Sequence, residues 1–459
     1  MGTAMPREIR LNAFDMTCVG HIQQGLWTHP RDQSGRFNEL QYWMDYARKL
    51  EAGLFDGIFF ADVLGVYDVY GGSPDAALRG AVQVPANDPT LVIPAMAAVT
   101  RHLGFGVTCN LAYEQPFLFA RRMSTLDHLT GGRIGWNIVT GYLDSAARAV
   151  GLKGQMAHDD RYDLADEYMS LVYKLWEGSW DDDAVLNDRE RGIYADPARV
   201  RTIHHAGKQY TVDAMHLSAP SPQRTPVLYQ AGSSPRGRQF AATHAECVFV
   251  NGQKKDGVKE IVGDIRQRAA AFGRPADDVH VFLGATLVLG RTDAEAREKF
   301  EDYRRYVSSE AALVHAAASL GIDFSKYDPD EPIDTGKSNA IVSNVEAMNR
   351  SAGPQWTRRK LLEQMVLGSR QAPWVGSADT IADMLTDWSD ETGVDGFNLS
   401  RTVVPECIDD AVGLLVPALQ ERGAYKTAYR EGTYREKLFG RARLPASHTA
   451  AQYRSRPSG

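Results

Sequence analysis

The amino-acid sequence predicts a closed, TIM-like (β/α)8 barrel, and two observations support this prediction. Short apolar runs of strand-forming residues alternate along the chain with segments of helical periodicity. The runs are apolar almost throughout, as expected of parallel strands buried on both faces. An open, doubly wound sheet is the competing fold, but no GxGxxG motif follows the first run. The predicted strands are Ile9–Phe14, Gly57–Ala61, Leu103–Cys109, Arg133–Val139, Pro226–Gln230, Cys247–Asn251, Val279–Leu289 and Gly396–Leu399.

Segments between the predicted strands have the apolar spacing of amphipathic helices. We expect them to form the outer layer of the barrel. The clearest of them are Asn38–Ala52, Pro116–His128, Tyr162–Trp176, Val258–Ala271 and Ala378–Trp388.

We expect the barrel and its insertions to form one domain over residues 1–423. Three parts of the chain do not belong to a plain barrel. Residues 177–222 are polar and rich in turn formers, and they predict an insertion after the fourth strand. Residues 305–375 follow the seventh strand and hold helical segments and the loop FSKYDPDEPIDTGKSN, which predict a lid. Residues 424–459 carry eight Lys or Arg and two Glu with little apolar periodicity. This C-terminal arm either grips another subunit or extends into solvent.

The composition is that of a globular protein without an electrostatic preference for nucleic acid or membrane. The 459 residues have a net charge of −7. No apolar stretch approaches the roughly 18 residues of a membrane-spanning helix, and MGTAMPREIRLNAF at the start lacks the apolar region of a signal peptide. The four cysteines form no CxxC pair and no histidines have HExxH spacing, which argues against a metal site and favours a reducing compartment. We therefore expect a cytoplasmic enzyme.

Polar residues end the predicted strands. The active site of a (β/α)8 barrel lies at the C-terminal ends of its strands, so these residues mark the expected pocket. A helix cap or a turn explains each of them singly, but together they favour a polar, planar ligand. Asp62 ends the buried run IFFA, and Tyr67 and Tyr70 in the next loop are candidate walls. The strand-end residues are Asp62, Thr108, Asn110, Asn137, Thr140, Ser233, Ser234, Asn251 and Arg401.

The segment YQAGSSPRGR, residues 229–238, predicts a phosphate site. A strand leads through Gly232 into Ser233 and Ser234, and a proline then begins a helix that carries Arg236. Backbone amides at a helix N-terminus, serine hydroxyls and an arginine together bind phosphate. Phosphate sites of these barrels commonly follow the later strands. The alternative is a helix that is merely capped.

Three histidines, His21, His158 and His315, lie near the expected mouth of the barrel. A single histidine is more often packed or solvated than catalytic. These three are therefore candidates only in combination with the strand-end residues.

Five motifs resemble, in the same order, one enzyme family. They are AFDMTCVGHI (13–22), RRMSTLDHLTGGRIGWNIVT (121–140), HDDRYDLADEY (158–168), SPQRTPVLYQAGSSPRGR (221–238) and GVDGFNLS (393–400). In these motifs the chain is similar to the bacterial-luciferase-like, FMNH2-dependent two-component monooxygenases. Within them it resembles the branch that contains nitrilotriacetate, dibenzothiophene-sulfone, dimethylsulfide and long-chain alkane monooxygenases. The resemblance covers essentially the whole chain.

The resemblance implies an enzyme that takes reduced FMN from a separate NAD(P)H:flavin reductase and inserts one oxygen atom of O2 through a C4a-hydroperoxyflavin. It also implies a homodimer or homotetramer. The expected cofactor-binding residues are Asp62, Thr108, His158 and Tyr162 for the flavin and Ser233 and Ser234 for its phosphate, joined by Asn137 and Arg236 from the residue patterns above. The positions that match the proposed active site of the alkane enzyme are Cys18, His21, Tyr67, Gln83 and His315.

The expected chemistry divides these active-site residues by role. His21 or His315 could donate a proton to the departing hydroxide. Cys18 is a weaker candidate, as a nucleophile, because no residue next to it in sequence would depress the pKa of its thiol. A lid over residues 305–345 would keep water from the reactive flavin.

One departure from the family pattern bears on the substrate. Gly141-Tyr142 stands where the alkane enzyme has a serine and a histidine, which argues against alkane hydroxylation. Phe14, Tyr67, Tyr70 and Tyr142 near the pocket suit a small, apolar organosulfur or (hetero)aromatic substrate better than a polycarboxylate. Gln83, from the family match, is the further expected substrate-binding residue. The alternatives are long-chain alkane hydroxylation, oxidative cleavage of a flavin or related heterocycle, and a non-catalytic flavin-binding protein.

Overall fold

The computed structural model describes residues 7–232, 234–333, 356–369 and 371–454. Within them, eight parallel strands follow one another around a closed ring. This confirms the predicted TIM-like (β/α)8 barrel. In ring order the strands are β1 (Arg10–Met16), β2 (Gly57–Ala61), β3 (Gly104–Asn110), β4 (Ile134–Val139), β9 (Val227–Gln230), β10 (Cys247–Val250), β11 (His280–Gly290) and β13 (Gly396–Ser400).

The ring closes where the first strand meets the last. Asn12 of β1 lies opposite Asn398 of β13, and the Asn12 side-chain amide donates to Asn398 Oδ1 at 3.0 Å inside the barrel. A further strand, β12 (Trp374–Ser377), pairs with the outer end of β11 at Leu287–Gly290. The sequence analysis did not predict β12, because its four residues WVGS are too few and too mixed to stand out as a strand.

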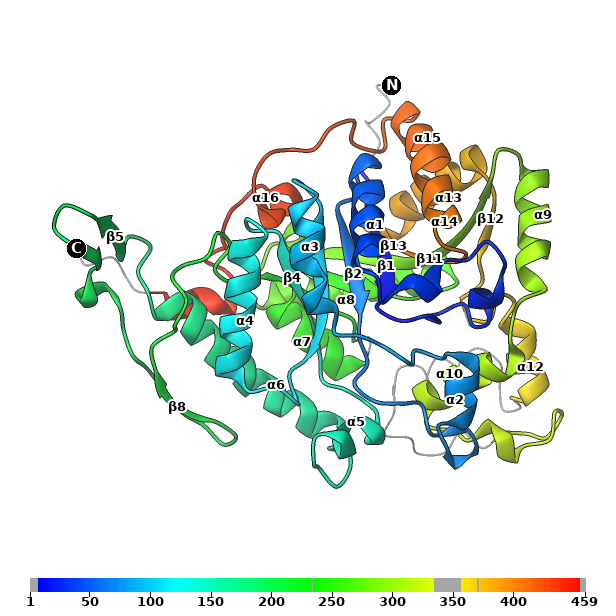
Figure 1. Cartoon of the computed structure of the whole chain (residues 1–459), viewed down its shortest axis with the longest axis horizontal. Coiled ribbons are helices and arrows are strands. Elements are labelled where there is room, and N and C mark those ends of the chain that lie inside the picture. The colour runs from blue at the N-terminus through cyan, green and yellow to red at the C-terminus, as the bar shows by residue number, and fades with distance from the viewer. Residues whose placement is uncertain (1–6, 233, 334–355, 370, 455–459) are drawn as a thin grey trace.

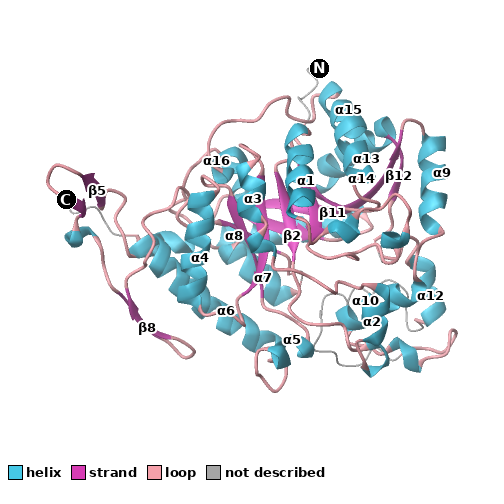
Figure 2. Cartoon of the chain, in the orientation of Figure 1, coloured by secondary structure: helices cyan, strands magenta, loops and turns pink. Residues whose placement is uncertain are grey.

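Helices surround the barrel, as Figure 2 shows. The predicted helices are present with shifted ends: one predicted from Tyr162 begins at His158, where Asp159 and Asp160 favour a helix N-terminus. The helices are α1 (Leu40–Ala52), α2 (Asp75–Gly80), α3 (Ile93–Ala98), α4 (Pro116–Leu129), α5 (Asp144–Ala149), α6 (His158–Tyr173), α7 (Pro235–His244), α8 (Lys255–Ala271), α9 (Asp293–Arg304), α10 (Ser309–Leu320), α12 (Arg358–Gln364), α13 (Ala378–Thr392), α14 (Glu406–Asp410), α15 (Val416–Glu421) and α16 (Tyr434–Phe439).

The two insertions lie at opposite sides of the barrel in Figure 1. The first, between β4 and β9, forms two antiparallel hairpins that extend away from the barrel: β5 (Val185–Asp188) with β6 (Ile193–Ala195), and β7 (Ile203–Ala206) with β8 (Thr211–Ala214). The second, between β11 and β13, contributes α10 and α12. Buried alanines of α10 pack against Ala76 and Ala77 of α2, so this insertion covers loops that follow β2.

The described part of the C-terminal segment packs against the barrel's own N-terminal end. Tyr434 and Leu438 of α16 join the aromatic cluster inside the barrel, beside Tyr229 and Phe282. The ring of Tyr434 occupies the space that a side chain at Gly104 would need, since a Cβ there would lie 2.3 Å from it. Helix α16 therefore plugs the base of the barrel.

A buried ion pair holds this plug in place. Arg435 Nε donates to Glu246 Oε1 at 2.7 Å, and neither side chain is exposed to solvent. The same guanidinium donates to the backbone oxygens of Thr225 and Pro226, each at 2.9 Å. A buried charge needs hydrogen bonds or a counter-charge to offset the hydration that it loses, and Glu246 supplies a negative charge here.

We expect Glu246→Gln to lower the free energy of unfolding by about 3–5 kcal/mol, because the change leaves the Arg435 cation buried without a counter-charge. Urea denaturation followed by circular dichroism measures the effect. The matched control is Glu39→Gln, which breaks the exposed Arg36–Glu39 pair and should cost no more than about 1 kcal/mol. Equal losses in the two variants would show that the buried pair does not stabilise the plug.

Candidate active site

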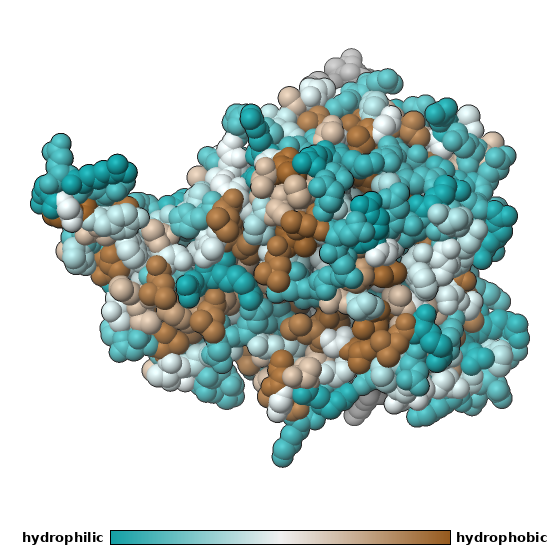
Figure 3. Space-filling view, viewed as in Figure 1, coloured by the Kyte–Doolittle hydropathy of each residue, from teal (hydrophilic) through white to brown (hydrophobic). Residues whose placement is uncertain are grey.

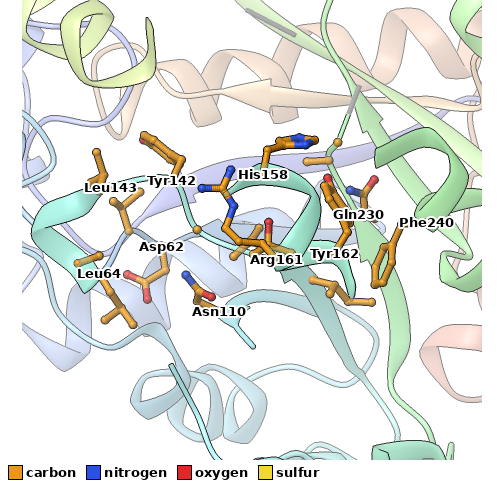
Figure 4. Close-up of a pocket in the computed structure, with 18 of the residues that line it drawn as sticks. Asp62, Leu64, Asn110, Tyr142, Leu143, His158, Arg161, Tyr162, Gln230 and Phe240 are labelled. Atoms are coloured by element: carbon orange, nitrogen blue, oxygen red, sulfur yellow. The ribbon is translucent and has the colours of Figure 1, made fainter. Parts of the chain in front are cut away.

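A cleft opens at the C-terminal end of the barrel, over the ends of β2, β3, β4 and β9. Its empty volume is about 1090 Å³, including the part open to solvent, a size comparable to that of cofactor sites. Figure 4 shows side chains from these strand ends and from α6 and α7 around one space. Among them are Asp62, Leu64, Asn110, Ile138, Tyr142, Leu143, His158, Arg161, Tyr162, Gln230, Ser234 and Phe240.

One end of the cleft is a small cradle at the N-terminus of α7. Ser234 caps this helix, and its hydroxyl accepts from the backbone N–H of Gly237 at 3.0 Å. His158 Nε2 lies 3.4 Å from the same hydroxyl. A Cβ at Gly232 or at Gly237 would lie 2.7 or 2.8 Å from the Tyr162 hydroxyl, so both positions require glycine. The cradle brings together a hydroxyl, an imidazole, a phenol and a helix N-terminus, which are groups that bind phosphate.

Two residues of the predicted phosphate motif are not part of this cradle as described. Ser233 lies outside the described residues. Arg236 points away from the cleft, where it forms ion pairs with Asp166 at 2.6 Å and with Asp163 at 3.3 Å. Its guanidinium stacks over the outer side of the Tyr162 ring, 5.4 Å from the centroid. The pattern of residues 229–238 predicted the cradle but could not show that Arg236 pairs with α6.

The other end of the cleft holds Asp62, the carboxylate that ends the β2 run. Burial raises the pKa of Asp62 to about 7, and Asp88 and Glu114 act in the same direction. Asn110 follows β3 on the same side of the cleft. Thr108 and Asn137, the other predicted flavin contacts, are buried and bond to each other at 2.8 Å without lining the cleft.

Tyr142 connects the cleft to a second group of predicted residues. Its hydroxyl lies 2.9 Å from the hydroxyl of Tyr67, which donates to Gln83 Oε1 at 2.6 Å. The Gln83 amide donates to the backbone oxygen of His21 at 3.0 Å and lies 3.5 Å from His315 Nε2. The structure thus brings five of the predicted catalytic and substrate-binding residues into one network, behind the cleft.

His21 and Cys18 lie deepest in this group. Both ring nitrogens of His21 are buried without a hydrogen-bond partner among the described residues, and burial holds the pKa of His21 well below its usual value. Burial also raises the pKa of the Cys18 thiol to about 12. Cys18 is therefore a thiol near neutral pH, which weakens its candidacy as a nucleophile.

The loop that carries these two residues is fixed by a buried arginine. Arg401 donates to the backbone oxygens of Cys18 and Val19 at 2.8 and 2.7 Å and pairs with Asp15 at 3.0 Å. The sequence analysis singled out Arg401 only as a strand-end residue. The structure gives it a positioning role for the loop.

The two remaining predicted substrate residues do not line the cleft. Phe14 packs inside the barrel against the edge of the His21 ring, with centroids 4.7 Å apart. Tyr70 packs against buried residues of the second insertion. Both lie next to the network behind Tyr142 rather than in the cleft.

Several residues that line the cleft were not predicted. Arg161 immediately precedes Tyr162 in the motif HDDRYDLADEY, and Gln230 is the last residue of a predicted strand. Both lie close in sequence to residues that were predicted to bind the flavin, Tyr162 and Ser233. That closeness was the only indication in the sequence that Arg161 and Gln230 belong to the site. Phe240, on α7, had no such signal and follows only from its position in the fold.

Comparison with known proteins identifies the family. The chain matches the luciferase-like monooxygenases over residues 14–396. It belongs to this family.

Several relatives of this luciferase-like monooxygenase match almost its full length. Dimethyl-sulfide monooxygenase of Hyphomicrobium sulfonivorans is 47% identical over 98% of this chain and 94% of its own. Long-chain alkane monooxygenase of Geobacillus thermodenitrificans is 48% identical over 98% of this chain and 99% of its own. A solved structure of riboflavin lyase, with modified FMN and the substrate riboflavin, has a TM-score of 0.92 at 37% identity and covers 98% of this chain and 100% of that one.

These matches confirm the predicted family, the barrel fold and the monooxygenase class. They leave the individual site residues as predictions. The described part of the chain holds no group of three or more His, Cys, Asp or Glu side chains that could bind a metal ion. It also holds no helix long and apolar enough to cross a membrane.

The raised pKa of Asp62 predicts a pH-dependent cost in stability. The unfolded chain ionises this carboxyl near its ordinary pKa of 3.8, whereas the folded chain keeps the proton up to about pH 7. Stability from this group therefore falls as pH rises from about 4 to 7. We expect the stability advantage of the ligand-free Asp62→Asn variant over the unmodified protein to be larger at pH 8 than at pH 5, by about 1 kcal/mol or more.

Chemical denaturation at both pH values checks this expectation, with Asp45→Asn on the exposed side of α1 as control. The difference between Asp62→Asn and the unmodified protein isolates Asp62, because all other groups titrate alike in both. A difference that is the same at pH 5 and pH 8 would show that the Asp62 carboxyl has an ordinary pKa.

Proposed function

We propose that the chain is the oxygenase component of an FMNH2-dependent, two-component monooxygenase. The observation that carries this proposal is the cleft itself, which joins the cradle at the α7 N-terminus to the strand-end groups around Asp62. A flavin mononucleotide has a phosphate at one end and a planar, hydrogen-bonding ring system at the other. The two ends of the cleft supply matching groups in that order.

The residues present fit this cofactor. Ser234, Tyr162 and His158 would hold the phosphate, and Gly232 leaves the space that the cradle requires. Asp62, with Asn110 beside it, would meet the ring system. When bound, reduced FMN would supply the electrons that activate O2. We place Thr108 and Asn137 beneath this end of the cleft as supporting residues, since they bond to each other there.

The chain itself would shield and orient the reaction. Helix α10 packs over α2 and carries His315 towards Gln83 and Tyr67, so the second insertion covers the network from the solvent side. His315 is partly exposed, whereas His21 is buried and neutral. His315 is therefore the better proton donor of the two, and the Tyr142–Tyr67 pair would hold the substrate side of the cleft.

The substrate we propose is a small, apolar organosulfur or (hetero)aromatic compound. The cleft is lined by Leu64, Ile138 and Leu143 in addition to the Tyr142 phenol, and these side chains match an apolar compound with limited hydrogen bonding. The relatives act on dimethyl sulfide and long-chain alkanes, and one cleaves riboflavin. Alkane hydroxylation, oxidative cleavage of a flavin and flavin binding without catalysis remain the alternative functions.

The function is tested with the pure chain, FMN, NADH and an added flavin reductase under 18O2. We expect no NADH oxidation without the reductase. With it, we expect one 18O atom in a product from a panel of dialkyl sulfides, aromatic heterocycles, riboflavin and long-chain alkanes, identified by mass spectrometry. NADH turnover by the pure chain alone would contradict the proposal. Flavin binding with hydrogen peroxide as the sole oxygen product across the panel would favour the non-catalytic alternative.

His315→Ala is expected to separate catalysis from flavin binding. The cleft residues that would hold FMN do not include His315, so the Kd for FMN should change by no more than about twofold. Product yield should fall about 100-fold, the usual scale for removal of a general acid, and the O2 consumed should appear as hydrogen peroxide. The control is His204→Ala on the exposed β7–β8 hairpin. An unchanged product yield in His315→Ala would move the proton donor to His21 or Tyr67.

The two-component scheme implies a partner enzyme. A separate NAD(P)H:flavin reductase would supply FMNH2 in the cytoplasm.

A homodimer or homotetramer also stays a prediction. Exposed leucines support it, since Leu91, Leu118 and Leu129 are 75%, 62% and 62% exposed. Hydrophobic patches lie over the α3–α4 side in Figure 3. The C-terminal arm supports it less, because α16 is buried in its own barrel.

A further inference from the structure

Arg161 is a buried cation in the wall of the cleft. Its side chain comes from the first turn of α6, next to Tyr162, and the residue is 2% exposed. Figure 4 shows its guanidinium between Tyr142 and His158, directed into the space that the cleft residues surround.

This guanidinium lacks the partners that other buried arginines have. Its Nη1 donates to the backbone oxygen of Met156 at a long 3.4 Å, and its Nε has no partner among the described residues. No carboxylate of the described chain lies within 4.0 Å of it. By contrast, Arg401 and Arg435 pair with Asp15 and Glu246 at 3.0 and 2.7 Å.

Arg133 and Arg274 are also buried without a carboxylate partner, but they donate to several oxygens of the described chain. Arg161 has one long hydrogen bond, so donors of its guanidinium are available to an anion in the cleft.

The acidic groups near Arg161 in the described part of the chain form no ion pair with it. Asp144 stabilises the Arg161 cation through space, but it forms no ion pair with Arg161, and its Oδ1 accepts from the backbone N–H of Gln155 at 2.8 Å. Asp62 lines the same cleft and has a pKa raised by burial to about 7, so it is partly protonated at neutral pH. The remaining neighbours that influence Arg161 are the phenols of Tyr113 and Tyr162. The interior of the cleft is thus positive and suited to an anion.

We propose that Arg161 binds an anionic group of the flavin nucleotide in the cleft, a role that the sequence analysis gave to Arg236. The inference rests on the proposed function. The anionic group has two sources in reduced FMN, the phosphate and the negative charge that the reduced ring system carries. Either would form charge-assisted hydrogen bonds with a planar guanidinium. Arg236, paired with Asp163 and Asp166 outside the cleft, has no such role.

The test uses Arg161→Met, Arg161→Lys and Arg236→Met in the full chain, with Kd values for FMN and riboflavin and the midpoint potential of bound FMN. If the phosphate is the partner, Arg161→Met weakens FMN binding about 10-fold or more and leaves riboflavin binding unchanged. If the reduced ring is the partner, Arg161→Met weakens reduced FMN about 10-fold relative to oxidised FMN, which lowers the midpoint potential by about 30 mV for a two-electron couple. Arg161→Lys keeps the positive charge, so it should retain most of the FMN affinity and of the midpoint potential of the unmodified protein. Arg236→Met should change neither quantity.

A readout without flavin completes the test. Because Arg161 lacks a counter-charge in the ligand-free chain, Arg161→Met should unfold at a higher temperature than the unmodified protein. A lower unfolding temperature, together with equal loss of FMN and riboflavin affinity, would show a purely structural role and overturn the inference. Loss of FMN affinity in Arg236→Met but not in Arg161→Met would also overturn it. Failure of the unmodified chain to bind FMN would instead overturn the proposed function.

Discussion

The packing of α16 against the base of the barrel is the constraint on which the rest of the molecule depends. Tyr434 and Leu438 complete the aromatic interior, and the Arg435–Glu246 pair fixes them there without solvent contact. With the base closed, the described part of the barrel has its cleft at the end where the strands terminate. The polar strand ends, the α7 cradle and the network behind Tyr142 therefore gather at one mouth, and the second insertion packs over the loop that follows β2.

Burial sets the charge of that mouth. It raises the pKa of Asp62 and Cys18 and lowers that of His21, so that each of these groups is closer to neutral than it would be in water. An arginine keeps its proton under the same burial because its ordinary pKa is so high. Arg161 is the one arginine or lysine among the described residues that line the cleft. Phenols and an amide make up the hydrogen-bonded network behind Tyr142.

The limits of sequence reasoning follow from the same physics. The barrel was predictable because strands buried on both faces leave continuous apolar runs, and the cradle because a helix cap, glycines and serines must follow one another along the chain. Arg161 and Arg236 could not be ranked, because both are arginines beside motif residues. Arg236 on α7 pairs with Asp163 and Asp166 of α6, whereas Arg161 has no such ion pair among the described residues. Which acidic side chains of α6 face α7 depends on how the two helices pack. The packing of the C-terminal arm could not be predicted for a related reason. The sequence around Arg435 is typical of a solvated segment, and its buried partner Glu246 lies far away in sequence.

The order in which the chain is made has a consequence for how it folds. The ring closes only when β1 meets β13, where hydrogen-bonded side chains are 386 positions apart, and the interior is complete only after residue 438 has left the ribosome. Contacts of such long range are formed late and slowly. Until then the nascent chain exposes strand edges and an aromatic interior, a state that chaperones bind and that aggregates readily at high expression. Low temperature and slow induction are the physical remedy during recombinant production.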